Sequence, residues 1–116
     1  MRKLKIKRRL SRNKDQRRAI LKTLAVALFE KEKIITTEAK AKELTSFAQK
    51  KIEKAKNKNI QSIRLLNKFF PKKIVTKLIE EIGPRYKERK GGYVRILKLE
   101  PRKLDGAKMF LVELMN

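Results

Sequence analysis

The residues of this sequence best suited to chemistry are the cations and glycines that stand together at Gly83 to Val94, in the stretch GPRYKERKGGYV. This stretch holds three of the four glycines of the chain and four cations, namely Arg85, Lys87, Arg89 and Lys90. Glycines let backbone amides approach a phosphate or ribose closely, and arginine and tyrosine stack on unpaired bases. The pattern therefore favours a nucleic-acid-binding loop. The alternative is a plain connection between a helix and a strand, whose charges face water.

The N-terminal residues 1–12 form a second cationic cluster. Fully extended at about 3.3 Å per residue, its cations would span roughly 35 Å, and duplex nucleic acid carries phosphates densely enough to pair with many of them. We interpret residues 1–12 as an extended basic arm that orders on a polyanionic partner. The alternatives are a solvated tail, a nuclear-import signal or a heparin-type patch. The seven cations of the arm are Arg2, Lys3, Lys5, Lys7, Arg8, Arg9 and Arg12.

The charge of the whole chain indicates the same class of partner. There are 34 Lys and Arg residues against 12 Asp and Glu, which gives a formal net charge of +22 in 116 residues. Self-repulsion at this density opposes a compact state, so we expect a polyanion, above all nucleic acid, to neutralise it. Residues 1–18 alone carry ten basic side chains and one acid, so a basic arm precedes a body that is itself basic.

Catalytic and metal chemistry have little support in the sequence. The chain contains no cysteine and no histidine, which removes thiolate ligands, the commonest metal ligand and the commonest general base. Glu80 and Glu81 are adjacent, but neighbours on a helix point about 100° apart, so they make a poor acid and base pair. The sequence has neither a P-loop nor a dinucleotide-binding motif. We therefore predict no enzymatic activity, no catalytic residues, no metal site and no cofactor.

The sequence also limits the expected compartment. No apolar run approaches the roughly 18 residues that suggest a membrane-spanning helix. The apolar stretch 19–29 is interrupted by Lys22 and Thr23 and is not followed by a small-residue cleavage site, which disfavours a secretory signal. We expect a cytoplasmic protein, although the Arg-rich, acid-poor start also fits an organelle transit peptide. Binding of the basic second helix to an anionic membrane is disfavoured, because its apolar stripe is mostly alanine.

Capping signals and hydrophobic periodicity predict the elements that position these cations. Asn13, with Gln16 three residues later, starts a helix that runs to about Glu30. Its first turn holds Arg17 and Arg18, which have the wrong sign for the helix dipole, so we expect an outside anion to stabilise this end. The β-branched run KIITT that follows predicts a short strand.

Three further helices are expected before the glycine-rich stretch. Thr37 can cap the second helix, Asn59 starts the third, Pro71 opens the fourth, and Gly83 with Pro84 ends the fourth. The apolar stripes expected to be buried are Ala41, Leu44, Ala48, Ile52 and Ala55, then Ile60, Ile63, Leu66 and Phe70, then Ile74, Val75, Leu78, Ile79 and Ile82. The lysines expected to lie largely off the second stripe are Lys40, Lys42, Lys50, Lys51 and Lys54.

Two strand-like runs end the chain, YVRILKLE and KMFLVELM, joined by a turn that contains Asp105 and Gly106. They predict an antiparallel hairpin. The expected fold class is α+β, with a single two-layer domain over residues 13–116 after the arm. Its order is helix, strand, three helices and two strands, with a small three-stranded sheet packed on the helices.

Three segments of the chain resemble the bacterial large-subunit ribosomal protein seventeen family. They are MRKLKIKRRLSRN, QRRAILKTLAVALFEKEKIITTEAKAKEL and IGPRYKERKGGYVRILKLEPRKLDGAKMFLVEL. The strongest markers are ITT followed by KAKEL, at Ile35 to Leu44, and GPR followed by GGYVRILK, at Gly83 to Lys98. The similarity covers almost the whole length and is weakest between residues 45 and 73.

The resemblance implies a structural protein, monomeric within the ribosome, that binds 23S ribosomal RNA and neighbouring large-subunit proteins near the exit of the nascent chain. It implies no small-molecule substrate and no membrane insertion. The runner-up function is a non-ribosomal architectural DNA-binding protein, although the sequence lacks a groove-reading element and a dimerisation heptad. Besides the arm and the loop lysines Lys87 and Lys90, the residues expected to face RNA are Asn13, Arg17, Arg18, Arg85, Arg89, Gly91, Gly92, Tyr93 and Arg95.

Overall fold

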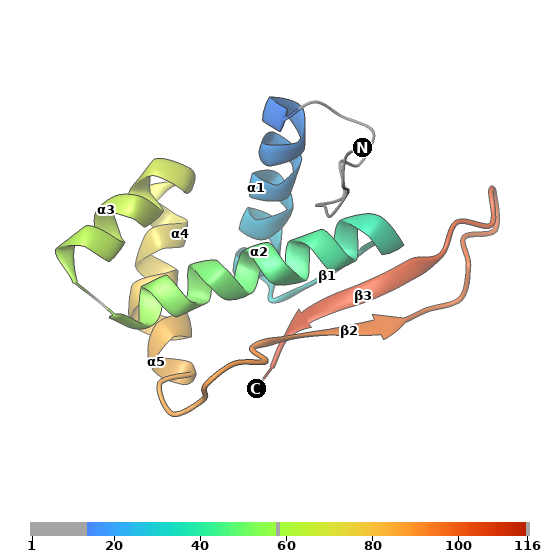
Figure 1. Cartoon of the computed structure of the whole chain (residues 1–116). Helices are drawn as coiled ribbons and strands as arrows, with labels where there is room; N and C mark the ends of the chain where they lie inside the picture. The colour runs from blue at the N-terminus through green and yellow to red at the C-terminus, as the bar shows by residue number, and fades with distance from the viewer. Residues whose placement is uncertain (1–13, 58, 116) are drawn as a thin grey trace, which may run out of the picture.

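The computed structural model describes residues 14–57 and 59–115, so the predicted arm (residues 1–12) and the predicted cap at Asn13 lie outside the described residues. Within these ranges the elements follow the predicted order (Figure 1). A small three-stranded sheet lies on one side of the body, and the helices cover one of its faces. The α+β fold class predicted from the sequence is therefore confirmed.

The first helix, α1, spans Lys14–Lys31, and the first strand, β1, spans Lys33–Thr37, close to the predicted bounds. Glu32 separates them, and its φ of 69° lies in the left-handed region that ends helices. Its amide N–H still bonds to the carbonyl oxygen of Leu28 at 2.6 Å, which completes the last helical bond. Because left-handed backbone is unfavourable for a residue with a Cβ, contacts of the Glu32 side chain must offset this cost.

The second helix, α2, spans Glu38–Asn57 and forms the centre of the molecule. It contacts all three strands and also α1, the third helix and the helical column described below. The predicted stripe of α2 is fully buried, because its small alanines let neighbouring elements approach closely. The prediction that Lys51 lies off this stripe is wrong. Lys51 is only 8% exposed, because its ammonium lies over the rings of Phe47 and Phe69.

The third helix, α3, spans Ile60–Phe69, and its start is fixed by the predicted cap. The Asn59 side-chain oxygen accepts a hydrogen bond from the amide N–H of Ser62 at 2.8 Å. Leu66 is buried as predicted, whereas Ile60 is 68% exposed. The prediction for Ile60 is wrong because the first turn of α3 places Ser62, rather than Ile60, against the body.

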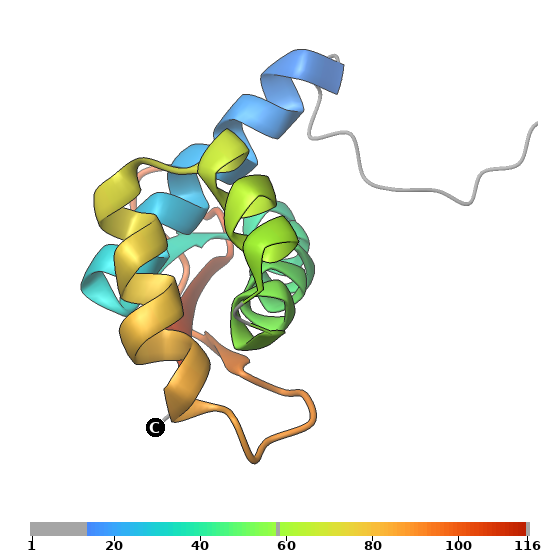
Figure 2. The same cartoon turned by 90° about the vertical axis from the view of Figure 1, so that its left-hand side faces the viewer.

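The next helical residues form one continuous column of three parts, α4 (Lys72–Lys77), η1 (Leu78–Ile82) and α5 (Gly83–Arg85) (Figure 2). The prediction that Gly83 and Pro84 end this helix is wrong. Gly83 has right-handed helical backbone, with φ −55°, and its N–H bonds to the carbonyl oxygen of Leu78, five residues earlier. This π turn brings Pro84, which has no N–H, into the first turn of α5, where proline is tolerated.

Gly83 is required by packing rather than by a helix end. A Cβ at this position would lie 3.1 Å from the carbonyl oxygen of Ala55 and 3.1 Å from that of Leu78. The column therefore approaches α2 so closely at this point that only glycine fits without a shift of backbone.

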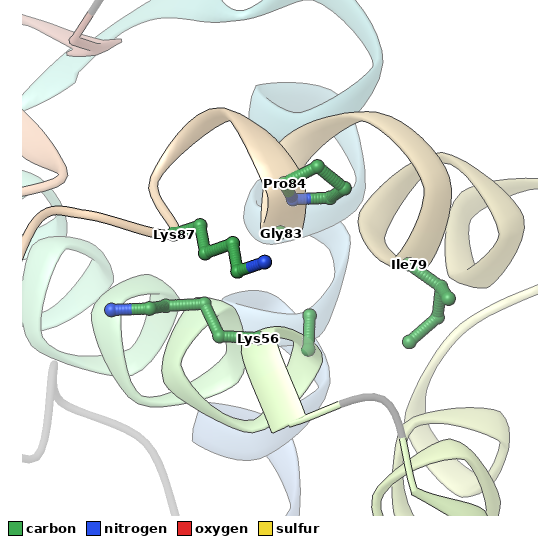
Figure 3. Close-up of a pocket in the computed structure, with 6 residues that line it drawn as sticks. Lys56, Ile79, Gly83, Pro84 and Lys87 are labelled. Carbon is green, nitrogen blue, oxygen red and sulfur yellow. The ribbon is translucent and has the colours of Figure 1, made fainter.

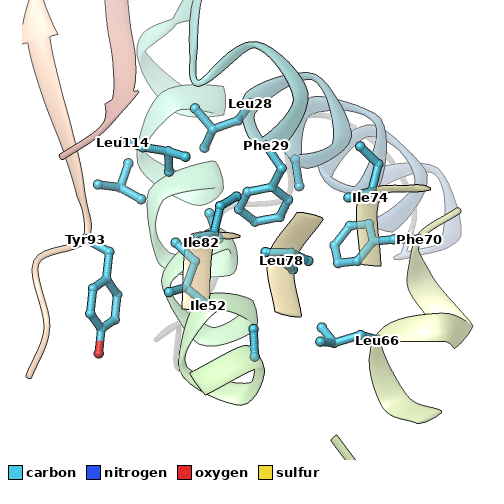
Figure 4. Close-up of a cluster of buried hydrophobic side chains, with 14 of the residues drawn as sticks. Leu28, Phe29, Ile52, Leu66, Phe70, Ile74, Leu78, Ile82, Tyr93 and Leu114 are labelled. Carbon is cyan, nitrogen blue, oxygen red and sulfur yellow. The ribbon is translucent and has the colours of Figure 1, made fainter. Parts of the chain in front are cut away.

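The sheet has the order β1-β3-β2, with β2 spanning Val94–Lys98 and β3 spanning Met109–Leu114, and both pairings are antiparallel. The predicted hairpin of β2 and β3 is therefore confirmed. In the register of the sheet, Val112 lies opposite Ile34 on one side and Ile96 on the other. Val112 belongs to the buried hydrophobic cluster, and Ile34 and Ile96 pack against it. Figure 4 shows part of this cluster, including Leu114 of β3.

The connection between β2 and β3 extends beyond the helices (Figure 1). Gly106 has a φ of 69°, which favours glycine, and its N–H bonds to the carbonyl oxygen of Arg102 at 2.8 Å. The Arg102 guanidinium donates two hydrogen bonds to the Asp105 carboxylate, and these bonds lower the pKa of Asp105 to about 2. The connection is thus a longer, internally bonded loop and not a two-residue turn.

Candidate nucleic-acid interface

Residues 83–93, called the connector below, contain four of the predicted cations and the three glycines of the predicted loop. Arg85 in this segment makes a bidentate ion pair with Glu32, with N–O distances of 2.9 and 3.0 Å. Lys77 adds a contact of 3.3 Å to the same carboxylate. Hydrogen bonding from Arg85, above all, lowers the pKa of Glu32, and the same bond raises the pKa of Arg85. This ion pair fastens the left-handed residue after α1 to the end of the column.

The two tyrosines of the connector belong to the core. Tyr86 is 1% exposed and Tyr93 is 2% exposed, with ring centroids 5.1 Å apart. The Tyr86 hydroxyl donates to the carbonyl oxygen of Met115, and burial raises the pKa of Tyr86. The prediction that these tyrosines stack on unpaired bases is therefore wrong, because neither ring is accessible.

A polar network holds Tyr93 against α2. Its hydroxyl donates to the carboxylate of Glu53 and accepts from the Lys56 ammonium at 2.8 Å. Its amide N–H donates to the side-chain oxygen of Gln49 at 3.0 Å. Lys56 also donates to the carbonyl oxygen of Arg89. The path of the connector is therefore fixed by hydrogen bonds from α2, which sequence periodicity does not reveal.

A small hollow lies between the first residues of the connector, η1 and the end of α2, with a volume of about 240 Å³ (Figure 3). It is lined by Lys56, Ile79, Gly83, Pro84 and Lys87 together with Ala55. Lys56 is already bonded to Tyr93 and to the connector backbone, so Lys87 is the accessible cation at this place.

Arg95, at the start of β2, is also engaged within the protein. Its guanidinium pairs with the carboxylate of Glu113 at 2.7 Å, and the two residues are direct neighbours across the sheet. The side chain of Arg95 remains 54% exposed, so part of the guanidinium still faces solvent.

The rest of the connector is open to a partner. Lys87, Arg89 and Lys90 are exposed, and none of them has a carboxylate within 4.0 Å among residues 14–57 and 59–115. Gly91 and Gly92 are exposed as well, and a Cβ at either would meet no atom within 4 Å. Gly92 has a φ of 63°, so it supplies the left-handed turn into β2. Together with the exposed acid Glu88, these five residues form an accessible part of the predicted loop.

The predicted cations at the start of α1 line a different surface, called the α1–α2 groove below. This groove has a volume of about 540 Å³ and lies between the first two turns of α1, the middle of α2 and the end of α3. Its cations are Lys14, Arg17, Arg18, Lys42 and Lys50, its acid is Glu43, and its remaining lining residues are Leu21, Ser46, Phe47 and Phe69.

The α1–α2 groove is strongly positive. In the described part of the chain, no carboxylate lies within 4.0 Å of Lys14, Arg18 or Lys50, whereas Lys42 pairs with Glu38 at 3.1 Å. Beside the groove, burial and then repulsion by neighbouring cations, among them Lys50 and Arg18, lower the pKa of Lys51. An anion in this groove would therefore relieve repulsion within the protein.

The structure does not bring the two predicted cationic regions together. The start of α1 and the connector lie at opposite ends of the body (Figures 1 and 2). The sequence interpretation also missed Lys42, Lys50, Phe47 and Phe69 as members of a surface. Lys42, Phe47 and Lys50 belong to one helix, but their spacing does not show that α1 and α3 lie beside them.

Other kinds of site find no support in the described residues. No group of three or more Asp and Glu side chains within them is arranged to hold a metal ion. No helix within them has the length and hydropathy required to cross a bilayer.

This chain is similar to known proteins over most of its length. A family model described as Ribosomal protein L17 matches residues 20–115, which is most of the chain. The chain belongs to the ribosomal protein L17 family. This membership confirms the resemblance seen in the sequence, and the match extends through residues 45–73.

Individual relatives cover nearly the full length. A protein of Natranaerobius thermophilus named large ribosomal subunit protein bL17 is 50% identical over 94% of this chain and 97% of its own length. The Pelobacter propionicus protein of the same name is 47% identical over 100% of this chain and 92% of its own length. The Borrelia hermsii protein, also so named, is 44% identical over 93% of this chain and 89% of its own length.

Proposed function

We propose that this protein is a structural component of the large ribosomal subunit that binds 23S ribosomal RNA and supports subunit assembly and stability on the exit-tunnel side. Its relatives are named as large-subunit proteins, and they match this chain over nearly its full length. Its partners are ribosomal RNA and neighbouring ribosomal proteins, and its compartment is the cytoplasm. Its role is to hold RNA in place, and it performs no reaction.

One observation carries this proposal: two surfaces at opposite ends of the body present cations without carboxylate partners among the described residues. They are Lys14, Arg18 and Lys50 in the α1–α2 groove and Lys87, Arg89 and Lys90 in the connector. Cations at two ends can bind separate RNA segments at the same time, as expected of a protein that joins them. The predicted arm at residues 1–12 and Asn13 would add further contacts to RNA.

Binding of this kind is mainly electrostatic, so it should depend steeply on salt. Each neutralised phosphate contributes about 0.7 to 0.9 to the slope of the logarithm of affinity against the logarithm of salt concentration. Most of the cations are lysines, 23 against 11 arginines, and lysine binds phosphate as a point charge. We therefore expect recognition of RNA shape rather than of base sequence.

The test is a titration of the full chain against a folded large-subunit rRNA fragment and a DNA duplex of equal charge. We expect tighter binding to the RNA across a salt series. Equal affinity for both would favour an architectural DNA-binding protein instead. Sedimentation of a cell lysate gives an independent readout, in which the protein should migrate with the large subunit after a moderate salt wash. A peak among free proteins would contradict the proposal.

A further inference from the structure

The α1–α2 groove is larger than the hollow beside the connector and, unlike that hollow, has an aromatic floor. Its volume of about 540 Å³ lies within the range of about 300 to 1,000 Å³ that is typical of small-molecule sites. Phe47 and Phe69 line it, and each ring is half-buried. Their ring centroids are 6.3 Å apart with planes at 81°, so they meet edge to face. Leu21 of α1 completes the apolar part.

The rim of the groove is cationic on both sides. Lys14, Arg17 and Arg18 come from α1, and Lys42 and Lys50 come from α2, against the single carboxylate of Glu43. Cations on two facing helices can reach successive phosphates of one strand, whereas cations on one helix face would reach only one side of it. The rim therefore suits an extended polyanion that passes between the two helices.

Lys51 places one more positive charge beside the floor. Its ammonium lies 3.6 Å from the ring centroid of Phe69 and 5.1 Å from that of Phe47. Among the described residues no carboxylate lies within 4.0 Å of this ammonium, although Lys51 is only 8% exposed. The cation–π contacts fix both rings and leave the charge without an anionic partner.

An unpaired nucleotide fits this combination better than other anions do. A nucleic-acid duplex presents phosphates outward and has no group for a recessed aromatic floor. An acidic peptide could pair with the rim, but carboxylates on short side chains do not need an aromatic floor either. A nucleotide in a single strand offers both a flat apolar base and an adjoining phosphate, and aromatic rings framed by cations are the usual site for it.

We propose that the α1–α2 groove binds an unpaired nucleotide of RNA, with its base against Phe47 and Phe69 and its phosphates at the cationic rim. This inference rests on the proposed RNA-binding function and adds a preference for a single-stranded segment at this end of the protein. The connector, which has no accessible aromatic ring, would bind phosphates without this preference.

The experiment compares two RNA probes on the full chain, a labelled single-stranded decamer and a blunt RNA duplex of equal charge. The variant Phe47→Leu with Phe69→Leu removes both aromatic rings but keeps apolar side chains. We expect it to weaken single-strand binding about fivefold or more, because aromatic stacking contributes on this order, and to change duplex binding less than about twofold. Lys50→Gln should weaken binding of both probes.

Phe110→Leu is the matched control, because Phe110 is also half-buried against the core but belongs to β3 on the sheet. It should leave binding of both probes unchanged. If circular dichroism shows that the double variant does not fold, photocrosslinking of the wild type with a single-stranded decamer that contains 4-thiouridine tests the nucleotide site instead. Crosslinks within α2 or at the end of α3 support the proposal, and crosslinks confined to other segments overturn it.

The remaining outcomes separate this inference from the proposed function. Wild-type binding to both probes with an unaffected double variant would overturn only the nucleotide site. Failure of the wild type to bind either probe would overturn both proposals. Displacement of the single-stranded probe by a glutamate decamer at equal concentration would assign the groove to an acidic protein segment and would also overturn the nucleotide site.

Discussion

The connector and the α1–α2 groove contain similar cations, yet the fold gives these cations different partners. In the connector, Arg85 pairs with Glu32, and the ring of Tyr93 packs against α2. In the groove, Arg18 and Lys50 have no carboxylate within 4.0 Å among the described residues. Part of the connector therefore stabilises the fold, although it is the more prominent motif in the sequence, while the groove cations form a second surface that is open to a partner.

The types of residues in a motif therefore do not establish their role. An arginine beside a buried tyrosine can bind RNA or hold a helix end, and the nearest carboxylate decides between these roles. Substitutions in the connector core should therefore change stability, whereas substitutions in the groove should change RNA affinity.

The largest expected change in stability follows a substitution at Gly83, the residue of the connector that packs most closely against α2. Gly83→Val should lower the free energy of unfolding by about 3 kcal/mol, because a side chain would meet the carbonyl oxygen of Ala55 at 3.1 Å. Gly91→Val is the control, since a Cβ there meets no atom within 4 Å. Urea unfolding measures both variants. Equal stability of the two would show that Gly83 is not needed for packing against α2.

A smaller loss of stability is expected from a substitution at Tyr93. This substitution tests whether Tyr93 has a structural role rather than a role in stacking on bases. Tyr93→Phe keeps the ring but removes the hydroxyl that bonds to Glu53 and Lys56. We expect a loss of about 1 to 2 kcal/mol in the free energy of unfolding, because these partners lose a charge-assisted hydrogen bond. Thermal and urea unfolding measure it. Unchanged stability would indicate that the network does not fix the connector.

The smallest expected effect concerns the exposed ion pair of Arg85. Glu32→Gln should lower the free energy of unfolding at neutral pH by about 0.5 to 1 kcal/mol. The folded-state pKa of Glu32 is below its ordinary value of 4.5, so the contribution of the carboxylate is fully present above that value. It is lost as the pH falls through the folded-state pKa, and the difference between wild type and variant should then disappear.

The control for this prediction is Glu80→Gln, which removes an exposed carboxylate that has no ion pair in the described part of the chain. Its stability should equal that of the wild type at neutral pH. Glu32→Gln should also leave RNA affinity undiminished, because it releases Arg85. A fall in RNA affinity would contradict a structural role for this pair.

Most of the fold was predictable because its signals are local. The cap at Asn59, the stripe from Ala41 to Ala55 and the KIITT strand each depend on residues within a few positions of one another. The errors at Gly83, Ile60 and Lys51 have a common cause. In each case the decisive contact comes from another element or from the orientation of a helix on the body, which periodicity does not contain.

The charge of +22, the helix-rich α+β fold class and the similarity to one family of ribosomal proteins all follow from the order of residues. Which cations pair with carboxylates and which line an open groove depends on how the helices and strands pack. The cause is distance. Charge and hydrophobic pattern are carried by neighbouring residues, but ion pairing requires two groups within about 4 Å, and for Arg85 and Glu32 these groups are 53 residues apart.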